Sequence, residues 1–211
     1  MIIGITSFLA AGKGTVSEML KEKDFEVHSC SDIIREECRE QNIEITRDNL
    51  QKVGNELREK YGPNILAERL ATKIKKDLTK NYVVESIRTP PEIEELKQLS
   101  GFTLVFIDAN SRIRYERAKD RLKEKEHVDS YDAFMKSEQK ELESTNPNSQ
   151  QLLKCKELSE FTLENNDTIE NLKAQVNDLL LKIQVKQRQK ADWNTYFLTI
   201  AKKSKLYKKK I

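Results

Sequence analysis

The chain has 211 residues, of which 37% are apolar and 35% are charged, with a net charge of +3. This length supports one α/β domain with its own core, and two full domains would be crowded. No apolar run reaches the length of a membrane span, and the start lacks the basic leader of a secretory signal, so we expect a cytoplasmic protein without a membrane partner.

Five short runs rich in β-branched and aromatic residues are separated, for the most part, by longer stretches with a helical period. The runs cover residues 2–5, 25–27, 82–84, 103–107 and 161–163. Short apolar runs of this kind are typical of parallel strands that are buried on both faces. We therefore predict an α/β fold in three layers, with a parallel five-stranded sheet between helices.

Two of the helical stretches show where they begin. Thr46 starts one, which has Leu50, Val53 and Leu57 on its buried side and ends at Tyr61-Gly62-Pro63. Asp167, with Glu170 three residues on, forms a start that is similar to a capping box. The second helix should bury one apolar face, made of Ile169, Leu172, Val176, Leu179, Leu180 and Ile183.

The first predicted strand runs into SFLAAGKGT, residues 7–15, and then into a helical stretch. Backbone N–H groups and the helix N-terminus in such a turn point at an anion, and the lysine neutralises the outer phosphates. We expect Gly12, Lys13, Gly14 and Thr15 to bind a polyphosphate. The Gly-Lys-Gly-Thr ending resembles the P-loop of adenylate kinases and other nucleoside monophosphate kinases, with Ser7 at the usual first glycine.

Two further stretches resemble the same kinases, in the same order along the chain. SDIIR, residues 31–35, follows the second strand, where these kinases open an acceptor-binding helix, so the resemblance assigns Asp32 and Arg35 to the substrate. A helix cap is the alternative for Asp32, and a solvated helix charge is the alternative for Arg35. After the third strand, the resemblance places Glu85 at Mg²⁺ and Arg88 on the acceptor phosphate, with Asp108 as a weaker metal candidate.

The helix after the fourth strand carries several arginines. Arg114, Arg117 and Arg121 share one face, and a clustered cationic face costs repulsion unless an anion meets it. The resemblance implies that Arg117 and Arg121 close over the transferred phosphoryl group, that residues 123–129 form a lid tip, and that a helix from Tyr131 brings the chain back. An ordinary solvated helix, paired with its own carboxylates, is the alternative.

The kinase resemblance covers residues 1–181, with an acceptor-binding insertion near 31–62 and a lid near 122–150. It implies Mg²⁺-dependent transfer of the γ-phosphoryl group of ATP to a nucleotide-like acceptor, with Lys13, Arg88, Arg117 and Arg121 as catalytic residues and Thr15 and Glu85 around the metal. Two alternatives stay open. One is a reaction similar to that of dephospho-coenzyme A kinases, in which Asp32 takes a hydroxyl proton. The other is a nucleotide sensor without turnover.

Residues 182–211 form a basic tail with ten Lys or Arg and one Asp, which leaves a net charge of −6 on residues 1–181. Residues 191–201 resemble the opening helix of deoxycytidylate deaminases, although the H-x-E and P-C-x-x-C motifs of those zinc enzymes are absent. This resemblance implies the truncated start of a deaminase domain and a deaminase domain or subunit as partner. An amphipathic helix with a basic end is the alternative, and we do not expect a nucleic-acid partner, because only Tyr207 interleaves the terminal lysines.

The cysteines, Cys30, Cys38 and Cys155, lie far apart and are odd in number. Such spacing argues against a disulfide framework and against a structural zinc site. We expect three small thiols without a metal.

Overall fold

The computed structural model describes residues 1–122, 130–142, 146 and 148–208. Within this part of the chain, all five strands run parallel in the order β2-β3-β1-β4-β5. The strands are β1 (Ile2–Ser7), β2 (Phe25–Ser29), β3 (Asn81–Glu85), β4 (Phe102–Asp108) and β5 (Phe161–Glu164). Each strand contains one of the five predicted runs, which confirms the predicted α/β fold with a parallel five-stranded sheet.

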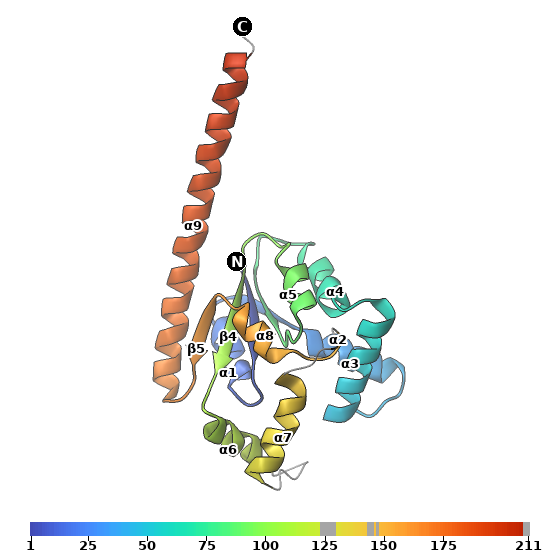
Figure 1. The fold of residues 1–211 in the computed structure, drawn as a ribbon. Coiled ribbons are helices and arrows are strands. Elements are labelled where there is room, and N and C mark those ends of the chain that lie inside the picture. The colour runs from blue at the N-terminus through green and yellow to red at the C-terminus, as the bar shows by residue number, and fades with distance from the viewer. Residues whose placement is uncertain (123–129, 143–145, 147, 209–211) are drawn as a thin grey trace.

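Helices lie on both faces of this sheet, and α9 runs on past its edge as a single long rod (Figure 1). They are α1 (Lys13–Lys21), α2 (Cys30–Glu40), α3 (Arg47–Tyr61), α4 (Ile65–Ile74), α5 (Pro90–Leu96), α6 (Ser111–Leu122), α7 (Tyr131–Leu142), α8 (Leu152–Glu157) and α9 (Ile169–Lys208). Helix α7 begins at the residue expected for the returning helix. Among the described residues, none of the helices combines the length and the apolar character that crossing a bilayer requires.

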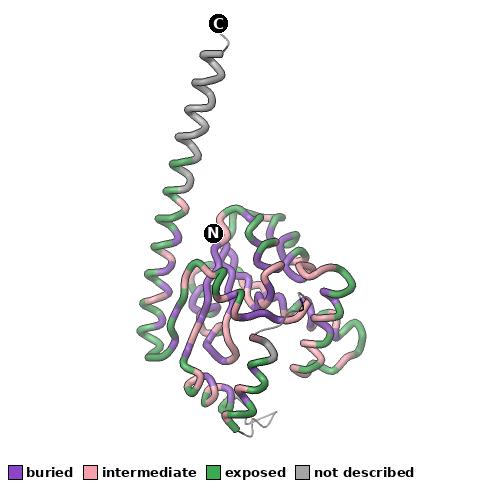
Figure 2. Tube along the Cα trace, viewed as in Figure 1, coloured by how far each residue is buried: buried purple, intermediate pink, exposed green. Residues whose placement is uncertain are grey.

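The alternation of side chains along each strand creates two separate cores. Ile3 and Ile5 of β1 point into a core shared with α1 and α9, whereas Ile2 points into a core shared with helices α2 to α5. Figure 2 shows the buried stretches concentrated in the sheet and on the inner faces of the helices. The sheet is therefore covered on both faces, and the loops that carry the candidate site residues follow the carboxyl ends of its strands.

The two predicted helix starts have different outcomes. Thr46 caps α3 by accepting a hydrogen bond from the Asn49 amide at 3.2 Å, and Gly62 ends the helix with a φ of 109°, as expected. The prediction for Asp167 was wrong, because the hydroxyl of Thr168 accepts the Asn171 amide and begins α9. A side chain at the residue just before the helix makes this contact with the third helical amide, so Asp167 is one residue too early.

The predicted apolar face of α9 is correct except at its first position. Leu172, Val176, Leu179 and Ile183 are buried, and Leu180 packs against the same core. Ile169 is 50% exposed, because the helix begins there at the edge of the body. Its side chain instead lines an open cleft beside the loop after β1.

Candidate nucleotide-binding site

The loop between β1 and α1 is shaped for an anion. Gly12 has a φ of 104°, which is strained for any residue with a Cβ atom, and a Cβ atom there would lie 2.1 Å from Nδ2 of Asn165 and displace that side chain. Helix α1 begins at Lys13 without a side-chain cap and without an acidic residue in its first turn. The first amides of α1 therefore face the loop with no carboxylate of that turn to compete with an anion.

Lys13 and Glu85 form the centre of this site. Glu85 ends β3, which pairs with β1 so that Glu85 lies beside Ile5, and its Oε2 atom is 2.6 Å from Nζ of Lys13. The hydroxyl of Ser17 donates to the same oxygen at 3.0 Å. Sequence reasoning missed Ser17, although its position one helical turn after Lys13 places the two on one face of α1.

Arg88 follows Glu85 on the loop between β3 and α5, and residues far along the chain hold it. Its Nη1 donates to Oε1 of Gln150 at 2.5 Å, and its carbonyl oxygen accepts the Gln151 amide at 2.9 Å. The Arg88 amide in turn donates to Glu92 at 2.8 Å. Gln150 and Gln151 lie just before α8, so they were not predictable as neighbours of Arg88 from local sequence.

Asp32 and Arg35 lie together on the first turns of α2. Their Oδ1 and Nη1 atoms are 2.7 Å apart, and both side chains are substantially exposed. Ser29 caps this helix by accepting the Ser31 amide at 3.2 Å, so the alternative of Asp32 as the cap is not needed. Asp108, the weaker metal candidate, is engaged by Lys156 at 2.6 Å and by the Ala109 amide.

Two buried thiols lie among the charges on this side of the sheet. Burial raises the pKa of the Cys30 thiol well above its usual range, and the nearby negative charge of Glu92 raises it further. Burial raises the pKa of Cys155 to about 12, again with a contribution from Glu92. Both groups are therefore neutral thiols at physiological pH and not reactive thiolates.

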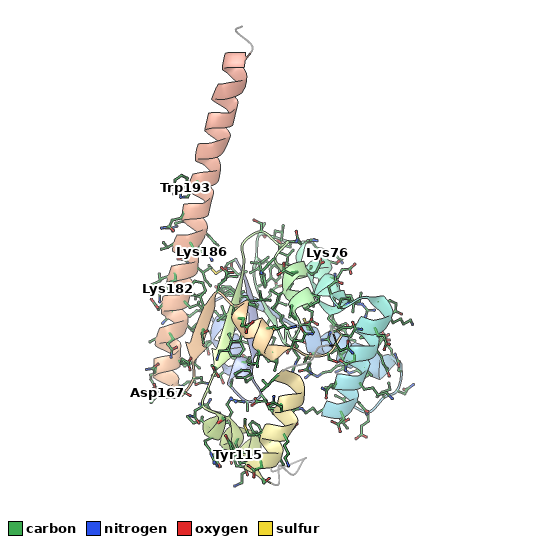
Figure 3. The ribbon with its side chains drawn as sticks, in the orientation of Figure 1. Lys76, Tyr115, Asp167, Lys182, Lys186 and Trp193 are labelled. Atoms are coloured by element: carbon green, nitrogen blue, oxygen red, sulfur yellow. The ribbon has the colours of Figure 1, made fainter. Side chains whose placement is uncertain are left out.

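A cleft of about 420 Å³ opens beside the loop and the first turn of α9. Arg117 reaches its wall from α6, where Nη2 donates to Oδ1 of Asn165 at 3.4 Å, and Nδ2 of Asn165 donates to the carbonyl oxygen of Ala11 at 2.8 Å. Asp167 lies at the start of α9, near the same end of the sheet as α6, which carries Tyr115 (Figure 3). The lining residues are Gly12, Thr15, Arg117, Asp120, Asn165, Asp167 and Ile169.

The three arginines of α6 that were predicted to share one face do not share one role. Arg114 is only 5% exposed and is paired with Glu138 of α7, so the counter-charge that meets it comes from the protein itself. Arg117 lines the cleft. The side chain of Arg121 and the predicted lid tip at residues 123–129 lie outside the described part of the structure.

The loop and the sheet define a P-loop protein with a kinase-like fold, and comparison with known proteins agrees. A family model described as an AAA domain matches residues 3–145. A UPF0200 protein of Sulfurisphaera tokodaii is 30% identical over 86% of this chain and 97% of its own length, and one of Pyrococcus abyssi is 30% identical over 87% and 97%. The chain therefore belongs to the AAA-domain family and, within it, to the UPF0200 proteins.

Other relatives are longer than the matched region. A UPF0200/UPF0201 protein of Archaeoglobus fulgidus is 32% identical over 86% of this chain, but the match spans 55% of that protein, and the match to a UPF0200 protein of Hyperthermus butylicus spans 65% of it. The chain thus covers about half to two thirds of these two relatives. None of these comparisons supports the deaminase resemblance of residues 191–201, which stays a prediction.

Solved structures match the fold at low sequence identity. TT1252 from Thermus thermophilus has a TM-score of 0.55 and 17% identity, over 86% of this chain and 97% of its own. The shikimate kinase of Bacteroides thetaiotaomicron has a TM-score of 0.54 and 12% identity, over 87% and 98%. At these identities the likeness shows the kinase-like P-loop fold and nothing about the substrate.

Proposed function

We propose that the chain binds Mg²⁺ and ATP at the loop of residues 7–15 and transfers the γ-phosphoryl group to a nucleotide-like acceptor. The observation that carries this proposal is the contact of 2.6 Å between Lys13 and Glu85 beside the uncapped start of α1. A lysine, a carboxylate and free helix amides in one place are the groups that phosphoryl transfer uses.

The donor side fits a triphosphate. A Cβ atom added at Gly14 would meet nothing within 4 Å, so the start of α1 is open on that side. Lys13 exchanges its contact with Glu85 for the β- and γ-phosphates, because a phosphate carries more charge than the single carboxylate. Glu85, which still accepts a hydrogen bond from Ser17, is then free to take part in holding a metal ion.

The residues present also fit Mg²⁺, which needs only one or two protein carboxylates because phosphates and water complete its shell. Glu85 and the hydroxyl of Thr15 would hold it, and the ion would supply neutralisation of charge on the phosphates. The cleft lined by Thr15, Arg117 and Asn165 lies next to this position and would take the nucleoside part of ATP.

The acceptor side is assigned to Arg35, Asp32 and Arg88. Arg88 lies three residues after Glu85, so an acceptor phosphate held by it comes close to the metal side of the donor. Arg35 can turn from its exposed contact with Asp32 to a second phosphate oxygen, since a surface ion pair is weak. Arg117 and Arg121 would neutralise the charge that spreads over the transferred group, so catalysis consists mainly of positioning.

The test is ³¹P NMR of ATP and Mg²⁺ with a panel of acceptors: AMP, dAMP, CMP, dCMP, TMP, GMP and dephospho-coenzyme A. We expect one acceptor to gain the phosphoryl group, and Lys13→Ala to slow this reaction by about 100-fold or more. Lys21→Ala is the matched control, because Lys21 lies on the same helix in an exposed pair with Glu18. Its rate should equal that of the unmodified chain.

Two other outcomes would redirect the proposal. ATP that binds through Lys13 but survives every acceptor would contradict the kinase and identify a nucleotide sensor. Phosphorylation of dephospho-coenzyme A alone would replace the phosphate acceptor with a sugar hydroxyl, and Asp32→Asn should then abolish the reaction because the proton acceptor is lost.

A further inference from the structure

The phosphate loop, residues 7–15, packs against α6 and α7, the two helices on either side of the predicted lid tip. Ala10 is buried against Ala118 of α6 and Phe134 of α7, and Leu9 packs against the same small cluster. This cluster is separate from the two cores that cover the sheet. The conformation of the loop therefore depends on the positions of α6 and α7.

The guanidinium group of Arg114 on α6 connects the phosphate loop to α7. Its Nε donates to the carbonyl oxygen of Ala109 at 2.9 Å, and its Nη1 donates to the carbonyl oxygen of Leu9 in the loop at 3.3 Å. Both terminal nitrogens also donate to the carboxylate of Glu138, with Nη2 at 3.0 Å from Oε2. Glu138 is 1% exposed, so the pair is closed to solvent.

The backbone held by this contact is strained. Ala10 has a φ of 58°, a left-handed conformation that is unfavourable for a residue with a Cβ atom and persists only when its surroundings hold it. In a trans peptide the carbonyl and the next N–H point in opposite directions. Arg114 therefore fixes the direction of the Ala10 N–H when it binds the Leu9 carbonyl oxygen.

We propose that Arg114 and Glu138 are positioning residues that hold the phosphate loop in its nucleotide-binding conformation. Glu138 acts through Arg114, and Arg114 acts through the Leu9 carbonyl, so neither side chain touches the nucleotide. This inference rests on the proposed function, since it concerns the affinity of the same loop for ATP. It gives α7 control over a loop more than 120 residues earlier in the chain.

The pair is not explained by stability alone. A buried ion pair is commonly no more stabilising than apolar residues of the same volume, whereas the loss of one partner leaves a costly buried charge. A double variant with both charges removed, Arg114→Met with Glu138→Met, leaves no buried charge and should therefore lose less thermal stability than Glu138→Gln alone, although the carbonyl oxygens of Ala109 and Leu9 lose a donor. It lacks the donor to Leu9, so the loop should bind ATP poorly in a fully folded protein.

The experiment measures the Kd for Mg²⁺ and ATP by calorimetry on the full chain, together with thermal unfolding. We expect the double variant to bind about tenfold or more weakly, the loss expected for a hydrogen bond to a charged group. The single variant Glu138→Gln should lose both affinity and stability. Asp132→Asn, an exposed position on the same helix, should change the Kd by less than about twofold.

A double variant that binds ATP as tightly as the unmodified chain would overturn the inference. Hydrogen exchange at the Ala11 amide, which donates to the Phe8 carbonyl oxygen at 3.3 Å, measures how often the loop opens and can be followed without nucleotide. It should be about tenfold faster in the double variant, and an unchanged rate would also overturn the inference. If the unmodified chain binds no ATP, or Lys13→Ala binds it equally well, the proposed function fails, and hydrogen exchange still decides the positioning role.

Discussion

Cys155 shows at the level of a single residue how burial links chemistry to stability. Its side chain is fully buried on α8, and its pKa is raised to about 12 from an ordinary value of 9.0. Between these two values the unfolded chain has lost the thiol proton while the folded protein keeps it. The unfolded state then binds fewer protons, so the free energy of unfolding falls as the pH rises.

We predict that Cys155→Ala flattens the alkaline loss of stability. The thiol should cost the unmodified chain up to about 1.4 kcal/mol for each pH unit between pH 9 and pH 12, and the variant lacks this contribution. Urea unfolding of both proteins with a reducing agent at pH 8, 9, 10 and 11 measures the difference. A gap between the two proteins that is the same at every pH would contradict the shifted pKa.

At the level of elements, one buried ion pair ties the predicted acceptor-binding insertion to the loop that carries Arg88. Arg58 of α3 donates through Nε and Nη2 to Oε1 of Glu92 at 3.0 and 2.8 Å. The other carboxylate oxygen accepts the amides of Arg88 and Thr89 and completes the capping box of α5. Helix α3, helix α5 and the Arg88 loop therefore share one charged centre.

We expect the loss of either partner of this pair to destabilise the protein strongly. Arg58→Ala and Glu92→Ala should each lower the free energy of unfolding by about 3–5 kcal/mol, because each leaves a buried charge alone. The double variant should lose much less than the two losses combined. Lys52 and Glu56, an exposed pair on α3, serve as the control cycle and should couple by less than about 0.5 kcal/mol. Additive losses at Arg58 and Glu92 would refute the shared centre.

At the level of the whole molecule, α9 has an attached part and a projecting part (Figure 1). The attached part buries Leu172, Val176, Leu179 and Ile183, and it also contacts the body through Lys186 with Glu160 and through Gln187 with the carbonyl oxygen of Gly101. Trp193, further along the helix, is 60% exposed. Among the side chains that the structure describes, the core therefore takes its α9 residues from the first half of the helix.

We predict that a chain ending at residue 190 keeps its stability within about 1 kcal/mol, since the α9 side chains that the structure describes as buried all precede this residue. A chain ending at residue 181 loses the fully buried Ile183 and the contact of Gln187, and should be less stable by about 2–5 kcal/mol. Denaturant unfolding of the three lengths is the measurement. Equal stability of the two shortened chains would contradict the assignment of Ile183 to the core.

Patterns within one stretch of sequence were sufficient for much of the fold. The five apolar runs predicted the strands, because a strand buried on both faces needs apolar residues throughout. Thr46 and Gly62 predicted the ends of α3, since a cap is made between residues that are close in the chain. The Gly-Lys-Gly-Thr segment predicted the phosphate loop for the same reason. The start of α9 predicted at Asp167 was wrong by only one residue.

The tertiary structure decided everything that depends on partners from distant elements. Arg114 looked like a member of a cationic face for an external anion, but Glu138 neutralises it from another helix. Gln150 meets Arg88, and Asn165 meets Gly12, across sequence separations that no local pattern spans. The sequence by itself determined which segments form the sheet and the phosphate loop, because those signals are periodic and local, whereas only the folded chain decided which charges are buried and paired.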